Sequence, residues 1–365
     1  MLSKNKRILI TNLFTERGPT MKKPYLIAEI GVNFYDTAKE LGITPMEAAK
    51  MYVKAAKESG CDAAKFQSYK ANTIVSKNSP AYWDTTKEPT PTQHALFLKH
   101  DHFNKEDYQE LCDYCKEVGI DFMSTPFDYD SADYLDSMVD IYKISSSDLS
   151  NTPFIRHIAK KGKPIYISAG AAYLSEVEEA VRLIKSEGNN NICVLHCVLS
   201  YPTINENANL RVIETLKKVF PDIQIGYSDH TMPDDNMAIL TAAWMLGADV
   251  IEKHFTLNKN LTGNDHYHAG DPADFRKFCD NVDVLMAALG SSEKTVFPCE
   301  MTPRREARRS LVLTRDMKAG EVITEKDLMP KRPGTGINPR YIDIVIGRKV
   351  LTDLSEDTIL TWDMI

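Results

Sequence analysis

The sequence predicts a (β/α)8 TIM barrel followed by a small β-rich domain. Three observations support this fold class: eight short apolar runs alternate with helix-length segments, most runs end in polar residues, and the alternation stops near residue 290. Strands that alternate with helices pair in parallel, and eight such units close into a barrel. A chain of 365 residues has room for a barrel of ordinary size and one small additional domain.

The predicted elements follow in order along the chain. Strands are expected at residues 25–30, 63–67, 121–125, 141–145, 165–168, 192–197, 223–228 and 250–255. Helices are expected at residues 45–59, 105–118, 131–138, 153–160, 174–186, 210–219, 236–246 and 274–289. Thr44 before Pro45, with Glu47 three residues after the threonine, is typical of a capping box at the start of the first helix.

Four segments divide the chain. We expect residues 1–20 to form a disordered extension, 21–290 the barrel, 291–309 a polar, basic linker and 310–365 the second domain. Short strands of that domain are expected at residues 311–313, 321–323, 344–346 and 358–360. The long loop at residues 70–102 is rich in Pro, Thr and Ser and follows the second strand, on the barrel face that carries active sites. This position favours a lid over a linker.

Composition and charge exclude several classes of protein. A net charge of −7 argues against general nucleic-acid affinity, and no apolar run is long enough to span a membrane. Residues 301–349 nevertheless carry 12 Lys or Arg against 6 Asp or Glu, a basic segment suited to docking on the acidic remainder or to assisting an anionic ligand. Seven cysteines without framework spacing indicate a reducing, cytoplasmic environment. Cys112 and Cys115 are expected to be buried in a helix rather than to bind metal.

Two histidines follow neighbouring predicted strands. His230 ends the motif GYSDH and His254 the motif IEKH, so we expect both imidazoles at the same edge of the barrel. Two imidazoles with open positions beside them suit ions of the Mn, Fe or Zn class. His196 stands alone at the end of another strand and is more typical of a structural residue. His266 and His268 are expected beside the site or on the surface.

Lysines and hydroxyls converge on the same mouth of the barrel. Lys65 and Lys143 lie near the ends of their strands, and serine-rich turns follow other strands. Point charges together with hydroxyl and turn-amide donors favour a phosphate or a carboxylate ligand. The alternative interpretation is that the two lysines pair with Glu29, Asp148 or Glu252.

Seven motifs together carry a family resemblance. They are AEIGVN at 28–33, KFQ at 65–67, STPF at 124–127, GYSDHT at 226–231, EKHFT at 252–256, GNDH at 263–266 and KRPGTGI at 331–337. In this order they resemble the sialic acid (N-acetylneuraminate) synthase family. The resemblance implies a barrel with a C-terminal antifreeze-like (SAF) domain, in a domain-swapped homodimer whose SAF domains cap the partner's active site. It also implies an enzyme that condenses phosphoenolpyruvate with an N-acetylhexosamine to a nine-carbon 2-keto acid and phosphate.

The same resemblance implies roles for individual residues. His230 and His254 would hold a divalent metal, usually manganese, with magnesium or cobalt as alternatives. Phosphoenolpyruvate would contact Lys65, Thr125, Lys143, Ser146, Ser168 and Ser228, with Asp148 nearby. The amino sugar would contact Glu29, Gln67, Tyr201, Asp265 and Arg332, the arginine reaching in from the neighbouring subunit. Glu29 is expected to move protons on the attacking water or on a sugar hydroxyl, and a salt bridge to Lys65 is its alternative role.

Three positions depart from the family pattern: Phe34, Leu199 and His268. All three are expected around the sugar or phosphate pocket. The resemblance implies N-acetylmannosamine or a related amino sugar as the acceptor, and these departures leave legionaminic, pseudaminic or spore-coat sugar synthesis as alternatives. Two other classes stay open: a different metal-dependent barrel, such as a sugar-phosphate hydrolase or a Schiff-base aldolase using Lys65 or Lys143, and a non-catalytic carbohydrate-binding protein.

Overall fold

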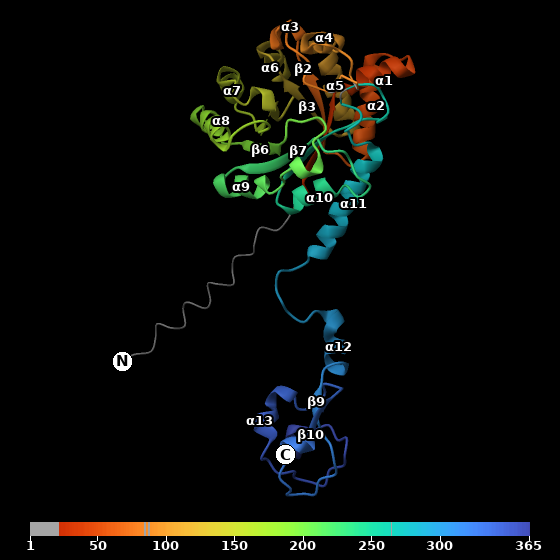
Figure 1. Ribbon diagram of the computed structural model, residues 1–365, viewed down its shortest axis with the longest axis vertical. Coiled ribbons are helices and arrows are strands. Elements are labelled where there is room, and N and C mark those ends of the chain that lie inside the picture. Colours follow the sequence, from red (N-terminus) through yellow and green to blue (C-terminus); the bar gives the residue numbers. More distant parts are fainter. Residues whose placement is uncertain (1–21, 84, 87, 264) are drawn as a thin grey trace, which may run out of the picture. The chain divides into compact units, whose positions relative to one another are not determined.

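The computed structural model describes residues 22–365 apart from residues 84, 87 and 264 (Figure 1). The predicted extension at residues 1–20 lies outside the described residues. The chain divides between Leu289 and Gly290 into a barrel unit and a C-terminal unit, each with its own hydrophobic core. In the described part of the chain, no helix is long and apolar enough to cross a membrane.

Eight parallel strands form the wall of the barrel unit. They are β1 (Tyr25–Gly31), β2 (Ala63–Ser68), β3 (Asp121–Pro126), β4 (Tyr142–Ile144), β5 (Ile165–Ser168), β6 (Ile192–Cys197), β7 (Gln224–Asp229) and β8 (Val250–His254). Hydrogen-bonded neighbours follow the order β3-β2-β1-β8-β7-β6-β5-β4, and β4 also contacts β3, which closes the wall. The predicted TIM barrel is confirmed, and each strand predicted for the barrel overlaps an observed one.

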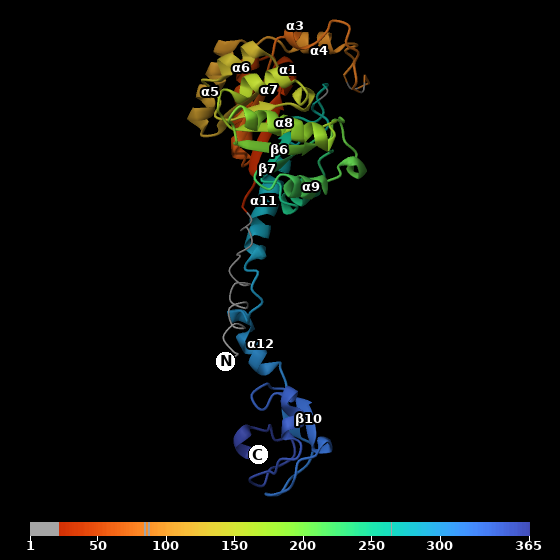
Figure 2. The ribbon, with the colours of Figure 1, turned by 90° about the vertical axis from the view of Figure 1, so that its left-hand side faces the viewer.

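Helices alternate with these strands and surround them in both views (Figures 1 and 2). Those that match predicted segments are α2 (Pro45–Glu58), α5 (Lys105–Val118), α6 (Tyr129–Leu135), α7 (Thr152–Ala159), α8 (Leu174–Ser186), α9 (Val212–Val219), α10 (Ala238–Met245) and α11 (Pro272–Leu289). The predicted capping box of Thr44 and Glu47 is formed at the start of α2. Helices α1 (Asn33–Leu41), α3 (Ala71–Ile74) and α4 (Gln93–Lys99) lie outside the predicted segments.

The interior of the barrel is built in layers, because successive side chains of a strand point to opposite faces. An apolar cluster occupies one set of alternate positions: Ile27, Ala63, Met123, Tyr166, Cys193, Leu195 and Val250. Two residues further along five of these strands stand the polar residues Glu29, Lys65, Thr125, Ser168 and Glu252. The polar layer at the catalytic end of the barrel therefore rests on an apolar layer.

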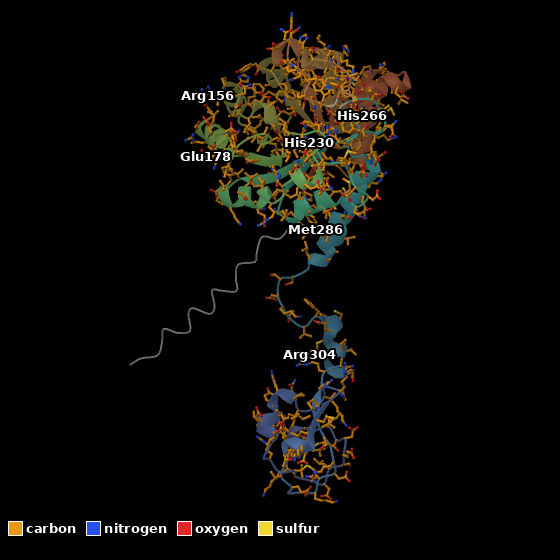
Figure 3. The ribbon with its side chains drawn as sticks, in the orientation of Figure 1. Arg156, Glu178, His230, His266, Met286 and Arg304 are labelled. Atoms are coloured by element: carbon orange, nitrogen blue, oxygen red, sulfur yellow. The ribbon has the colours of Figure 1, made fainter. Side chains whose placement is uncertain are left out.

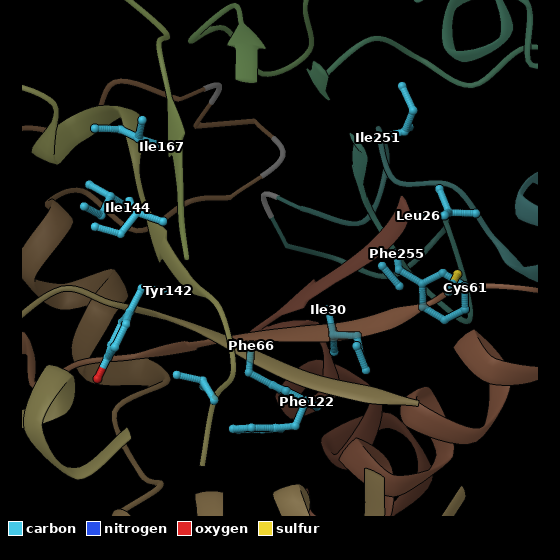
Figure 4. Close-up of a cluster of buried hydrophobic side chains, with 14 of the residues drawn as sticks. Leu26, Ile30, Cys61, Phe66, Phe122, Tyr142, Ile144, Ile167, Ile251 and Phe255 are labelled. Carbon is cyan, nitrogen blue, oxygen red and sulfur yellow. The ribbon is translucent and has the colours of Figure 1, made fainter. Parts of the chain in front are cut away.

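The outward face of the wall packs against the helices. Phe66 and Phe122 stack there with ring centroids 6.0 Å apart, close to Ile30 (Figure 4). Phe34 belongs to this core and is only 2% exposed, with its ring 5.8 Å from that of Phe66. The expectation that Phe34 borders the sugar pocket is therefore wrong. Helix α1 begins directly after β1 and turns Phe34 toward the core, whereas its neighbour Asn33 lines the pocket.

A buried ion pair joins the ends of β7 and β8 on this outward face. Asp229 and Lys253 are in register, and both side chains are 0% exposed. Lys253 Nζ lies 2.5 Å from an Asp229 oxygen and also donates to the Thr231 carbonyl at 2.7 Å. Each member of the pair precedes a predicted metal ligand, so the pair fixes the strand ends from which His230 and His254 project.

The C-terminal unit contains α12 (Met301–Glu306), β9 (Ser310–Leu313), β10 (Leu328–Lys331) and α13 (Ile342–Val345). Strands β9 and β10 pair in antiparallel fashion, and the predicted runs 321–323 and 358–360 contribute isolated bridges. The predicted strand at 344–346 is wrong, because Ile342 and Val345 pack against the core at the three-residue spacing of a helix.

The predicted linker at residues 291–309 contains α12, whose end contacts the loop that carries Arg332. Gly334 N donates to the Arg305 carbonyl at 2.7 Å, and a Cβ on Gly334 would lie 2.9 Å from Arg308 Cβ. A Cβ on Gly336 would lie 2.4 Å from the Leu360 carbonyl oxygen. Close backbone packing therefore requires both glycines of the KRPGTGI motif.

Candidate functional site

A cavity of about 460 Å³ lies at the carboxyl ends of the barrel strands. Its lining includes every predicted site residue of the barrel unit: Glu29, Lys65, Gln67, Thr125, Lys143, Ser146, Asp148, Ser168, Tyr201, Ser228, His230, His254 and Asp265. His230 lies inside this unit, whereas Arg156 and Glu178 lie at its outer edge (Figure 3). Arg332 lies in the C-terminal unit, and its contact with the sugar stays a prediction.

Buried charges of both signs form the floor of the cavity. Lys65 makes a close ion pair with Glu29 and lies 3.7 Å from Glu252, and all three residues are at most 5% exposed. Lys143 Nζ donates to the other Glu252 oxygen at 3.1 Å. Gln67 Nε2 donates to Glu29 at 2.8 Å. Both lysines therefore form the ion pairs of the alternative interpretation, with Glu29 and Glu252 as partners. Asp148 does not pair with either lysine and accepts a hydrogen bond from Asn151.

The two floor carboxylates have pKa values that diverge. Burial raises the pKa of Glu29 above its usual value, against the attraction of Lys65. Burial opposes ionisation of Glu252 as well, but Lys143 and Lys65 lower its pKa to about 2. Paired carboxyl groups with divergent pKa values are the arrangement that separates a proton-transfer group from a fixed charge. Glu29 is suited to proton transfer, and Glu252 is a permanent anion that holds the two lysines.

Replacing Glu252 with glutamine tests this assignment through acid stability. The folded pKa of about 2 lies below the unfolded value, so the ionised group stabilises the fold above about pH 4.3. That contribution, about 3 kcal/mol, is lost as the pH falls from about 4.3 toward 2. Urea unfolding at pH 7, 4.5 and 3 should show Glu252→Gln destabilised by about 3 kcal/mol or more at pH 7. The difference from wild type should shrink at pH 3; a constant difference would contradict the lowered pKa.

Hydroxyl groups line the cavity beside these charges. Ser228 Oγ donates to Glu252 at 2.9 Å, and Thr125 Oγ1 accepts from Lys65 at 3.2 Å. Ser146 Oγ accepts from the Gly170 amide at 3.0 Å. Ser168 Oγ is buried without a hydrogen-bond partner among the described residues. A buried hydroxyl without a partner is costly unless a ligand satisfies it.

Two histidines line the cavity two residues beyond Ser228 and Glu252. His230 and His254 are both 6% exposed, and their ring centroids are 5.4 Å apart. His230 Nδ1 lies 2.8 Å from the Val198 carbonyl, which holds that nitrogen as the N–H and leaves Nε2 for a ligand. Burial, together with the facing His268 and His230, holds the pKa of His254 well below its usual value, so the ring is neutral at pH 7.

The donor set fits a divalent metal. His254 Nδ1 is buried with no hydrogen bond to any described residue, and it lies 3.7 Å from an Asp265 oxygen. His254, Asp265 and His268 offer ligand atoms that all lie within 4.8 Å of one another. Neutral imidazoles and a carboxylate suit Mn, Fe, Co or Zn.

The other histidines near the strand ends have environments that differ from one another. His196 Nε2 donates to the Ala208 carbonyl at 2.8 Å, which is the structural contact expected for this residue. His266 and His268 are both 0% exposed, so the surface alternative is wrong for each. Their loop folds back along β8, which the sequence alone does not reveal.

A second cluster beside the cavity was not predicted from the sequence. His266 Nε2 lies 3.5 Å and His100 Nε2 3.9 Å from the same Asp36 oxygen. Burial opposes ionisation of Asp36, but these two imidazoles hold its pKa well below its usual range. The three residues come from α1, the segment after α4 and the loop after β8. No local motif could therefore have indicated that they lie together.

The predicted lid lies over the cavity. It contains α3 and α4, and it supplies an apolar and aromatic wall made of Ile74, Val75, Tyr82, Trp83, Leu96 and Phe97. Leu199, one of the three departures, also lines the cavity as expected. The loop therefore borders the site, as the sequence predicted, although it is partly helical.

Sequence profiles place both units in known families. The profile of the NeuB family matches residues 52–294. The chain belongs to the NeuB family. The SAF domain profile matches residues 308–365, which confirms the predicted antifreeze-like domain of this NeuB-family enzyme.

Relatives cover the whole of this NeuB-family chain. An uncharacterized protein of Methanocaldococcus jannaschii is 40% identical over 363 residues, with 98% of each chain covered. The N,N'-diacetyllegionaminic acid synthase of Legionella pneumophila is 36% identical over 370 residues, covering 100% of this chain and 99% of the relative. The solved structure of an N-acetylneuraminic acid (sialic acid) synthetase from Leptospira borgpetersenii has a TM-score of 0.65 and 29% identity, covering 77% and 90% of the two chains. The chain is therefore a synthase of the sialic and legionaminic acid type.

Proposed function

We propose that this NeuB-family synthase condenses phosphoenolpyruvate with an N-acylated amino sugar to give a 2-keto sugar acid and phosphate. One observation carries the proposal. A single cavity places lysines and hydroxyls that suit an anion beside histidines and a carboxylate that suit a divalent metal. Both halves meet at Glu29, which is in register with Lys65 on one side and His254 on the other.

The anion half suits phosphoenolpyruvate. Burial raises the pKa values of both Glu29 and Asp148. When Glu29 is protonated, Lys65 and Lys143 face a single fixed carboxylate, Glu252, and the floor attracts an anion. A bound phosphate would give Ser168 Oγ the hydrogen-bond partner that it lacks among the described residues. The serine and threonine hydroxyls of the cavity are therefore the proposed phosphate contacts.

The proposed reaction forms one carbon–carbon bond and breaks one carbon–oxygen bond, with proton transfers assigned to Glu29. C3 of phosphoenolpyruvate forms a bond to the sugar aldehyde carbon, the aldehyde oxygen takes a proton, and water adds to C2. The tetrahedral intermediate then breaks its C2–O bond and releases phosphate. Glu29 gives and takes the protons at the aldehyde oxygen and at the water. A bound divalent ion supplies a Lewis acid for the carbonyl oxygen of the sugar.

The distal wall indicates an acceptor without a phosphate group. Among the described residues that line the cavity, the permanent cations are Lys65 and Lys143 alone, and both pair with carboxylates at the floor. The far end is formed by apolar side chains such as Trp83 and Phe97, with Asp36 nearby. These surfaces suit acyl or deoxy methyl groups and disfavour a second phosphate.

We therefore expect kcat/KM for a free amino sugar to exceed that for its 6-phosphate by at least about tenfold. The assay is phosphate release from phosphoenolpyruvate with a panel of N-acylated sugars, free and 6-phosphorylated, with the product identified by mass. The preference should persist in Arg332→Ala, since the barrel unit sets it. Preference for the 6-phosphate would overturn this choice of acceptor, and phosphate release without any sugar would overturn the condensation.

A Schiff-base aldolase fits the site less well. Such an enzyme needs a neutral lysine amine. Burial opposes the charge on Lys65, yet Glu252 and Glu29 hold its pKa above the usual value. Lys65 therefore stays an ammonium group, and borohydride with both substrates should trap no adduct.

A further inference from the structure

The loop after β8 brings two more donors to His254. Asp265 Oδ2 lies 3.7 Å from His254 Nδ1, and the rings of His254 and His268 have centroids 4.9 Å apart. All three residues offer ligand atoms within 4.8 Å of one another. His254 and His268 are 6% and 0% exposed, so this group is buried.

The loop holds His268 in place through its backbone. Gly270 N donates to the His254 carbonyl at 2.8 Å, and Thr256 N donates to the Gly270 carbonyl at 3.0 Å. Tyr267 Oη donates to the Tyr201 carbonyl at 2.9 Å. His268 thus lies on a segment that is fixed on both sides, as a metal ligand requires.

The separation of His254 from Asp265 fits a shared ion better than direct contact. Two N or O ligands bonded at about 2.1 Å to one ion are about 3–3.5 Å apart for angles of 90–110°. The 3.7 Å between His254 Nδ1 and Asp265 Oδ2 is too long for a hydrogen bond and is close to that range. His254 Nδ1 has no hydrogen-bond partner among the described residues, so an ion would satisfy it.

We propose that His268 is a third histidine of the metal centre, and that His254, Asp265 and His268 bind one divalent ion before any substrate arrives. His230, whose ring centroid is 5.4 Å from that of His254 and 6.3 Å from that of His268, is the other histidine of this centre. The proposal rests on the metal of the proposed function but not on its substrates.

The ligand types determine which divalent ions the site prefers. Mg²⁺ and Ca²⁺ prefer sites made of oxygen ligands, whereas imidazole favours Mn²⁺, Fe²⁺, Co²⁺ or Zn²⁺. Three imidazoles with one carboxylate therefore select the second group. Without substrates, Co²⁺ should bind at least about tenfold more tightly than Mg²⁺.

The test is a metal titration of the full-length protein after chelator treatment, without phosphoenolpyruvate or sugar. Free Mn²⁺ measured by electron paramagnetic resonance gives the affinity of wild type, His268→Gln, Asp265→Asn and His157→Gln. His157 is a matched control because its imidazole pairs with Asp133 near the surface. We expect His268→Gln and Asp265→Asn to lose at least about tenfold in affinity, and His157→Gln to lose none.

Two further readouts separate the outcomes. Nitrogen couplings to bound Mn²⁺ in wild type should include the His268 ring and should lose one imidazole in His268→Gln. If that variant does not fold, the wild-type spectrum alone decides between three imidazoles and two. Wild-type affinity in folded His268→Gln, or only two coupled imidazoles in wild type, would overturn the proposal. Turnover that still needs metal would then leave the proposed function intact.

Discussion

Replacing His254 with alanine is expected to abolish turnover and to weaken divalent metal binding by at least about 100-fold. His254 ends β8 with its Nδ1 buried and without a hydrogen-bond partner among the described residues. Its ring faces both His230 and His268, so it is the shared member of every metal arrangement that this site allows. Alanine removes this shared donor. Steady-state phosphate release and metal titration measure the two losses.

The matched control is His196→Gln. His196 is the last but one residue of β6, but its ring donates to the Ala208 carbonyl, and a glutamine amide can replace that donor. We expect this variant to keep activity and metal affinity within about threefold of wild type. Full activity of His254→Ala after chelation, without added metal, would end the metal-site hypothesis.

The second large effect is expected for Glu29→Gln. Glutamine keeps the shape and the contact with Gln67, but it cannot exchange a proton, so kcat should fall by about 10²–10⁴-fold. Burial raises the pKa of Glu29, which means that the ionised carboxylate does not favour the folded state at pH 7. Lys65 keeps Glu252 at 3.7 Å. Thermal stability should therefore change little while activity collapses.

The exposed Glu110, which pairs with Lys50 on the surface, provides the control variant Glu110→Gln. This change should affect neither kcat nor stability. A kcat for Glu29→Gln within tenfold of wild type would contradict the proton-transfer role. A large loss of stability in the same variant would show that the salt bridge to Lys65 is its main role.

The barrel and most of the cavity were predictable because their signals are local. Each strand is an apolar run with a polar residue at its end, and period-two alternation places Lys65, Ser228 and Glu252 on one inner layer. His230 and His254 stand two residues after Ser228 and Glu252, so the same alternation places them one layer higher. The family motifs then indicate roles that geometry alone leaves open.

The features that could not be predicted depend mainly on contacts between residues that are distant in sequence. Asp36, His100 and His266 come together only when α1, the predicted lid and the loop after β8 meet. Phe34 follows a strand end as a site residue would, but an unpredicted helix turns it into the core. In the C-terminal unit, the apolar run at 344–346 is too short for its period to distinguish a strand from a helix.

The central claim is condensation with cleavage of the C–O bond of phosphoenolpyruvate. The most direct measurement uses phosphoenolpyruvate labelled with ¹⁸O in the bridging position, together with metal and the best acceptor sugar. The mass of the released phosphate then reports which bond breaks. We predict that phosphate appears only when both substrates are present and that it retains the label, because water adds to C2 and the C2–O bond breaks. Unlabelled phosphate, or release without sugar, would contradict the account.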